Sequence, residues 1–331
     1  MENSYPNQDP IDNMPSPFFF TIKDLTTAFS VGETFLKAVD RVDLQIIEGE
    51  IMGLAGESAC GKSTLAYSIL RLLPANGEIQ SGEIFFNGKD LVKMNDDELR
   101  EIRWKEIAMI FQGAMNALNP TMTVDEQIME AILAHEDTTT EEAEGRTLKL
   151  FDQVEISERF LKSYPHELSG GMKQRIMIAM ALACKPRLLI SDEATTALDV
   201  IVQKHILDLM KRVQEEMNLS MLFITHDLSV IAQTCDRCAI MYAGKIVEIA
   251  DIESIFLEYL HPYTKALINA FPDIRSDKKI IGISGSPPNL INPPLGCRFH
   301  PRCPLTQDIC KRVEPVLEKK HEHSVACHMV K

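Results

Sequence analysis

The sequence GESACGKS occupies residues 56–63, directly after the apolar run IMGLA at 51–55. It fits the pattern G-x-x-x-x-G-K-S, in which a buried strand passes through a glycine-bounded loop into a helix whose N-terminus faces a phosphate. Lys62 is expected to reach the β- and γ-phosphates, and the Ser63 hydroxyl to hold Mg²⁺. The helical pattern at 64–70 completes the motif, so the chain is predicted to bind a nucleoside triphosphate. The residues expected around the phosphates are Gly56, Glu57, Ser58, Ala59, Cys60, Gly61, Lys62, Ser63 and Thr64.

A second motif, LSGGMKQR at 168–175, stands directly before the helix-patterned stretch 176–184. A Ser-Gly-Gly at the start of a helix exposes a hydroxyl and backbone amides at the positive end of the helix dipole. Ser169, Gly170 and Gly171 are therefore predicted to form a second phosphate site. One chain cannot readily wrap both sites around a single nucleotide.

Three further apolar runs end in polar side chains, as expected at the ends of strands where α/β sheets place their chemistry. The run RLLISDE at 187–193 ends in two carboxylates. Asp192 is predicted to hold Mg²⁺ through water, and Glu193 to act as general base on the attacking water. Runs at 109–112 and 221–226 end in Gln112 and His226, and the Gln112 amide is placed to contact Mg²⁺ or the water.

In their order and spacing these motifs resemble those of the ATP-binding cassette (ABC) family over residues 20–255. The resemblance implies an α/β P-loop NTPase fold of the ABC type: a RecA-like α/β core with an antiparallel β edge and an inserted helical subdomain. It places a disordered tail at 1–17, the nucleotide-binding domain at 18–260 with its helical subdomain at 114–183, and a C-terminal extension at 261–331.

The resemblance also implies how the motifs act. Two domains are expected to pair head to tail, so that the P-loop of one and Ser169 of the other enclose each ATP. Glu193, His226 and Gln112 are the expected catalytic residues, and Asp199 ends the segment 196–199 that matches the D-loop of the family. Phe29 is the expected adenine-stacking side chain, with Phe35 as the alternative.

Composition narrows the function classes. The chain has 331 residues and a formal net charge of −14, which argues against nucleic acid as the main partner because phosphate contacts require basic surface. No run of 18 apolar residues and no signal peptide is visible in the sequence, so we expect a cytoplasmic protein.

Four of the eight cysteines, Cys297, Cys303, Cys310 and Cys327, lie in a proline-rich segment at the end of the chain. A segment of this kind could hardly bury a hydrophobic core of its own, and a bound metal would supply the order that a core would otherwise provide. Their spacing lacks the close pair that is usual at zinc sites and suits a [4Fe-4S] cluster at least as well. Four nearby histidines, His300, His321, His323 and His328, keep a mixed zinc site open. Cys235 and Cys238 are interpreted as structural thiols.

The segments HPYTKAL at 261–267, GSPPNL at 285–290 and GCRFHPRCP at 296–304 resemble the C-terminal extension of ATPase subunits from oligopeptide and dipeptide importers. That resemblance favours the [4Fe-4S] cluster over zinc. It implies a second cassette subunit, commonly a paralogue, two transmembrane permease subunits and an extracytoplasmic substrate-binding protein, with the ATPase on the cytoplasmic face of the inner membrane. Nickel complexes or another small solute are alternative substrates. Soluble ABC ATPases of DNA repair or translation usually carry two cassettes or a long coiled-coil insertion, and a small-molecule kinase would leave the motif at 168–175 without a role.

Overall fold

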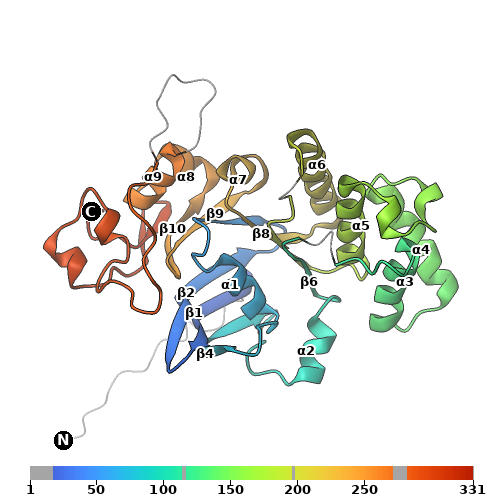
Figure 1. Ribbon diagram of the computed structural model, residues 1–331, viewed down its shortest axis with the longest axis horizontal. Helices are drawn as coiled ribbons and strands as arrows, with labels where there is room; N and C mark the ends of the chain where they lie inside the picture. Colours follow the sequence, from blue (N-terminus) through green and yellow to red (C-terminus); the bar gives the residue numbers. More distant parts are fainter. Residues whose placement is uncertain (1–17, 114–116, 196–197, 271–281, 331) are drawn as a thin grey trace, which may run out of the picture.

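A computed structural model describes residues 18–113, 117–195, 198–270 and 282–330. Within these ranges the molecule has an antiparallel sheet, a larger mixed sheet, a helical subdomain to one side and a C-terminal extension on the opposite side (Figure 1). The predicted disordered tail at 1–17 lies outside the described residues.

The antiparallel sheet has the strand order β2-β1-β4-β5. It packs an apolar face, which includes Phe20, Ile22, Leu44 and Ile84, against α1 (Lys62–Ile69) and the central strands of the larger sheet. This is the β edge expected from the resemblance. Its strands are β1 (Phe18–Val31), β2 (Thr34–Ile47), β4 (Gly77–Phe86) and β5 (Lys89–Asp90).

The larger sheet has the order β11-β12-β10-β9-β3-β8-β7-β6, in which β11 (Glu318–Lys320) and β12 (His323–Val325) come from the C-terminal extension. Its central strands β3, β7 and β8 are buried along their whole length, as expected of parallel strands covered on both faces. Strands β6, β7, β8, β3 and β9 run parallel, so their C-terminal ends meet at one edge. The bounds are β3 (Ile51–Ala55), β6 (Ile107–Ile110), β7 (Leu188–Asp192), β8 (Ser220–Thr225), β9 (Arg237–Tyr242) and β10 (Lys245–Asp251).

The helical subdomain lies between β6 and β7 in the chain and projects to the side of the sheet (Figure 1). Capping boxes at Thr123 and Thr139 fix the starts of α3 and α4, since the glutamate three residues on accepts a hydrogen bond from the backbone N–H of each threonine. Its elements are α3 (Val124–His135), α4 (Thr140–Gln153), α5 (Gly170–Leu182) and the short 3₁₀ helices at Glu158–Phe160 and Pro165–Glu167.

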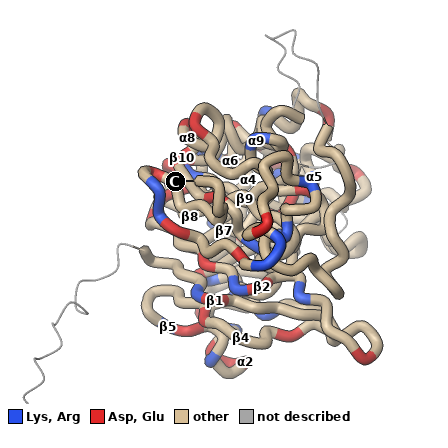
Figure 2. The backbone as a smooth tube through the Cα atoms, turned by 90° about the vertical axis from the view of Figure 1, so that its left-hand side faces the viewer, with Lys and Arg blue, Asp and Glu red and all other residues tan. Residues whose placement is uncertain are grey.

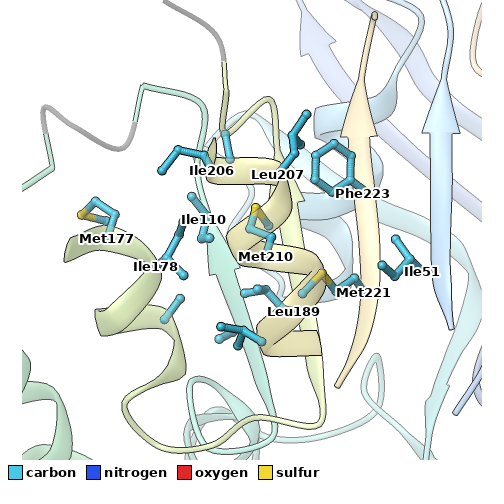
Figure 3. Close-up of a cluster of buried hydrophobic side chains, with 14 of the residues drawn as sticks. Ile51, Ile110, Met177, Ile178, Leu189, Ile206, Leu207, Met210, Met221 and Phe223 are labelled. Atoms are coloured by element: carbon cyan, nitrogen blue, oxygen red, sulfur yellow. The ribbon is translucent and has the colours of Figure 1, made fainter. Parts of the chain in front are cut away.

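The helices of the core domain cover the faces of the larger sheet. In α6, Leu207 and Met210 lie toward Phe223 and Met221 of β8, and Ile206 lies toward Ile110 of β6 (Figure 3). This apolar layer fixes the position of the strand ends that carry the polar motifs. The helices are α1 (Lys62–Ile69), α2 (Asp96–Ile102), α6 (Val200–Met217), α7 (Leu228–Thr234), α8 (Ile252–Leu257) and α9 (Pro262–Asn269).

The C-terminal extension is built onto the cassette rather than around a core of its own. Its strands β11 (Glu318–Lys320) and β12 (His323–Val325) continue the larger sheet beside β10. Phe299 is buried against Tyr242 and Tyr263, with ring centroids 5.2 and 5.3 Å apart. Two further 3₁₀ helices span His300–Arg302 and Asp308–Lys311.

The carboxylate of Glu248 in β10 links the C-terminal extension to the cassette. It is fully buried and accepts hydrogen bonds from the backbone N–H groups of Leu260 and His261, at 2.7 and 3.0 Å. His323 Nδ1 of β12 lies 2.8 Å from Glu248 Oε1.

On the face of the molecule that carries the C-terminus, acidic and basic residues are interspersed (Figure 2).

Candidate functional site

The loop between β3 and α1 takes the form that the sequence predicts for phosphate binding. Gly56 and Gly61 have φ angles of 156° and 112°. A Cβ on either glycine would lie 2.1 Å from a backbone oxygen, that of Met241 or that of Ala38. Glycine is therefore required at both positions, by space and, at Gly61, by its left-handed backbone.

Lys62 is buried at the start of α1 and folds back over the loop. Its ammonium donates hydrogen bonds to the carbonyl oxygens of Gly56 and Glu57, at 2.8 and 3.0 Å. The Cys60 thiol lies 3.7 Å from the same ammonium, and burial raises its pKa. The lysine is thus held at the loop, where an anion would meet its charge.

Asp192 ends β7 beside the loop, and its environment fits a cation. The side chain is fully buried, and neither carboxylate oxygen has a hydrogen-bond partner among the described residues. Burial raises the pKa of this carboxyl, and the Ser63 hydroxyl and Lys62 ammonium oppose that shift in part. A buried carboxylate without a partner is costly. The donor set of Asp192 with Ser63 is the oxygen chemistry that Mg²⁺ prefers.

Glu193, the next residue, is held by two side chains that the sequence singled out. The Gln112 amide donates to Glu193 Oε2 at 2.7 Å, and His226 Nδ1 lies 2.9 Å from Glu193 Oε1. Glu193 has a left-handed backbone, φ 49°, directly after the last residue of β7. The ends of β6, β7 and β8 therefore meet at one carboxylate.

Lys62, Gln112, Glu193 and His226 line one pocket of about 640 Å³, whereas the fully buried Asp192 does not. Phe29 lines this pocket, whereas Phe35 is 47% exposed and does not. The sequence did not predict the contribution of the extension, whose Pro287, Pro288 and Leu290 line the same pocket. The full lining is Phe29, Leu36, Ala38, Ser58, Ala59, Gly61, Lys62, Ser63, Thr64, Gln112, Glu193, His226, Pro287, Pro288 and Leu290.

Two residues of the C-terminal part contact the phosphate loop itself, and the sequence gave no sign of either role. Arg302 binds the Glu57 carboxylate with two hydrogen bonds, at 2.7 and 3.0 Å. The Tyr263 hydroxyl accepts a hydrogen bond from the Glu57 backbone N–H at 2.9 Å. Arg302 lies next to Cys303 in the segment that carries the subfamily resemblance, but only the folded structure places it at the loop.

The second predicted phosphate site lies elsewhere. Ser169 caps α5, accepting a hydrogen bond from Met172 N, and it is exposed together with Gly170. None of Ser169, Gly170 and Gly171 lines the pocket around Lys62. Asp199 caps α6 nearby, while Thr196 and Ala197 of the predicted loop lie outside the described residues.

The structure does not support the metal site expected in the extension: within the described ranges no three His, Cys, Asp or Glu side chains are arranged to hold a metal ion. The four thiols of Cys297, Cys303, Cys310 and Cys327 nevertheless line one small cavity, and no cysteine of the chain forms a disulfide. Burial raises the pKa of Cys297 to about 11. Cys235 and Cys238 are buried in the cassette.

Comparison with known proteins identifies relatives over nearly the whole chain. Residues 39–196 match the ABC transporter family model, and residues 247–310 match that of the oligopeptide/dipeptide transporter C-terminal region. The chain is 44% identical to the dipeptide transport ATP-binding protein DppD of Caldanaerobacter subterraneus, over 93% of this chain and 96% of that protein. It is 41% identical to the oligopeptide transport ATP-binding protein OppD of Escherichia coli, over 93% and 92%.

A solved structure is also similar. It is the dimeric post-hydrolysis state of an ATP-binding cassette bound to ADP and Pi, with a TM-score of 0.64 and 30% sequence identity. The match covers 70% of this chain and 98% of that one. The predicted α/β cassette fold is confirmed by this likeness.

Proposed function

The chain belongs to the ATP-binding cassette transporter family, and from this premise we propose that it is the ATP-hydrolysing motor subunit of an importer of dipeptides or oligopeptides. The match of residues 247–310 to the oligopeptide/dipeptide transporter extension supports this substrate class. The observation that carries the ATPase assignment is the meeting of Lys62, Glu193 and His226 at one pocket.

ATP occupies this pocket with its phosphates at the loop of residues 56–63. Lys62 binds the β- and γ-phosphates, because its buried ammonium already lies on the loop. Ser63, Asp192 and Gln112 would hold Mg²⁺, and the bound ion would supply positive charge to neutralise the transferred phosphoryl group. Phe29 lines the pocket and stacks on the base.

Hydrolysis depends on Glu193. Its carboxylate accepts a proton from the attacking water, while Gln112 and His226 hold its two oxygens in position. Both neighbours come from the ends of adjacent strands. A change in the sheet edge would therefore alter the direction in which this base points.

The working unit is a head-to-tail dimer in which Ser169, Gly170 and Gly171 contact the ATP of the opposite subunit. Three observations support it. Ser169, Gly170 and Gly171 do not line the nucleotide pocket of their own chain. Next to them, at the start of α6, Val200 and Ile201 are 80% and 70% exposed. The similar cassette bound to ADP and Pi is a dimer.

We place the dimer under two transmembrane permease subunits on the cytoplasmic face of the inner membrane, supplied by an extracytoplasmic substrate-binding protein. The second cassette is a paralogue of this chain. The relatives named as transport ATP-binding proteins support this assembly. In the described part of the chain no helix is long and apolar enough to cross a membrane.

The extension carries a [4Fe-4S] cluster on Cys297, Cys303, Cys310 and Cys327, with zinc as the alternative. The proposal rests on the four cysteines, none of them in a disulfide, that line one cavity, although no three of the described side chains are arranged there to hold a metal ion. A bound cluster would stabilise the extension, because it links segments that share little other core.

Uptake in the source organism tests the proposal. A strain without this chain should lose uptake of a radiolabelled dipeptide or tetrapeptide, and the wild-type chain should restore it. The Glu193→Gln chain, expressed at the same level, should not. Loss of nickel uptake with peptide uptake intact would move the substrate to the alternative class, and no transport defect at all would contradict the motor role.

A further inference from the structure

The nucleotide pocket has a wall that the cassette domain does not supply. Pro287, Pro288 and Leu290 come from the C-terminal extension, yet they line the pocket that also contains Lys62 and Phe29. Phe29 itself packs on the backbone at Gly77, since a Cβ there would lie 2.8 Å from its ring. An apolar surface from the extension and an aromatic ring from β1 thus border the same space.

This surface is suited to a flat apolar group. Proline rings present rigid apolar faces and the residue has no backbone N–H, so covering them leaves no donor unsatisfied. The neighbouring Asn289 side chain is occupied by its own backbone, accepting from Ile291 N at 2.9 Å. The wall can therefore bind a ligand through apolar contact area but not through a set of hydrogen bonds.

Arg302 anchors this wall to the phosphate loop. Its Nε donates to the Ser284 carbonyl at 2.9 Å, three residues before Pro287, and its stem packs against Gly285. Its two terminal nitrogens bind both oxygens of Glu57. The Arg302 side chain is only 5% exposed, so the fork is held in a fixed direction. The planar guanidinium of arginine binds both carboxylate oxygens and fixes its orientation, whereas a lysine ammonium would act as a single flexible charge.

We propose that the extension closes the nucleotide site of its own chain: the base lies between Phe29 and the Pro287-Pro288 wall, and Arg302 is the positioning residue that ties this wall to Glu57. The inference rests on the proposed ATP-binding function. It assigns to the extension a part in nucleotide binding that is separate from its cysteines.

Binding of Mg·ATP and of Mg·tripolyphosphate, measured by calorimetry on the full chain, tests this. Tripolyphosphate has no base, so it reports on the phosphate loop alone. The double variant Pro287→Gly/Pro288→Gly should weaken ATP binding about fivefold to tenfold, the lower end of a base-stacking contribution, and leave tripolyphosphate binding unchanged. The matched control is Pro293→Gly/Pro294→Gly, a second proline pair of the extension that does not line the pocket.

Arg302→Lys tests the positioning role. It should weaken ATP binding by a similar factor, and adding it to the Pro287→Gly/Pro288→Gly variant should cause little further loss, because both changes remove one wall. ATP affinity equal to that of the control pair would overturn the proposal, as would equal losses for ATP and tripolyphosphate or fully additive effects. A wild-type chain that binds neither ligand would instead contradict the proposed function.

Discussion

The side-chain amide of Gln112 donates a 2.7 Å hydrogen bond to Glu193, joining two strand ends that are 81 residues apart in the chain. His226 holds the other carboxylate oxygen from a third strand. The expected base is thus oriented by two side chains of its own chain. Catalytic groups of this kind work through positioning as much as through their acidity.

Glu193→Gln should lower ATP turnover by about 10²- to 10⁴-fold, the usual contribution of a general base. The amide keeps the shape of the side chain, so ATP binding should persist and favour the closed dimer. Turnover measured by phosphate release, with binding measured in parallel, checks this. Lys62→Ala is the comparison, because it should weaken binding itself. An unchanged hydrolysis rate in the glutamine variant would show that Glu193 is not the base.

Ser169→Arg should leave nucleotide binding by the isolated chain intact and abolish hydrolysis. The reason is geometric: Ser169 does not line the pocket of its own chain, so the bulk of arginine interferes only when two cassettes close. Equilibrium binding to dilute monomer and ATPase activity of the assembled transporter distinguish the two effects. Weakened binding in the monomer would contradict the composite site.

Glu248→Ala should destabilise the chain by about 3 to 5 kcal/mol. The change leaves the N–H groups of the half-buried Leu260 and the buried His261 without their acceptor, and it removes the contact with His323. Urea unfolding followed by circular dichroism measures the loss. Glu253→Gln, an exposed acidic position on α8, is the matched control and should stay within about 0.5 kcal/mol. Equal stability of both variants would show that Glu248 does not hold the extension on the cassette.

Acid should destabilise the extension through His261. Burial lowers the pKa of His261 from 6.5 to about 3, so below pH 6.5 the unfolded chain takes up a proton that the folded chain excludes. The contribution of the neutral His261 to the free energy of unfolding is complete above pH 6.5 and is lost as pH falls toward 3; the loss is about 2 kcal/mol at pH 5.

The variant His261→Asn isolates this effect. Asparagine can still cap α9, where the His261 ring accepts from Tyr263 N, but it does not titrate. Urea unfolding at pH 7.5 and pH 5 should therefore show a smaller difference in the variant than in the wild type. An equal pH dependence would assign the acid sensitivity to other groups.

Anaerobically purified protein should be brown, with iron and sulfide in the ratio of a [4Fe-4S] cluster. Cys310→Ser should lose the colour because it removes one of four thiols on the shared cavity. Cys184→Ser is the control, since this buried thiol lies outside that cavity. Colourless protein with one zinc would overturn the cluster and favour the alternative.

The expected cassette could be read from the sequence because its motifs are short and local. A glycine-bounded loop between a strand and a helix, and carboxylates at the end of an apolar run, are fixed by neighbouring residues. The antiparallel edge and helical subdomain followed from the resemblance those motifs carry. The sequence favoured Phe29 over Phe35 as the adenine-stacking residue, but it could not exclude Phe35, because the sheet packing decides which ring lines the pocket.

By itself, then, the sequence determined the phosphate loop, the order of the catalytic groups and the family to which they belong. Only the tertiary structure brought Arg302 to Glu57, across 245 residues, and placed a proline wall of the extension in the nucleotide pocket. The physical reason is that a local backbone conformation follows from adjacent residues. A contact between distant segments depends instead on how the aromatic cluster around Phe299 and the pairing of β12 with β10 dock the extension on the cassette.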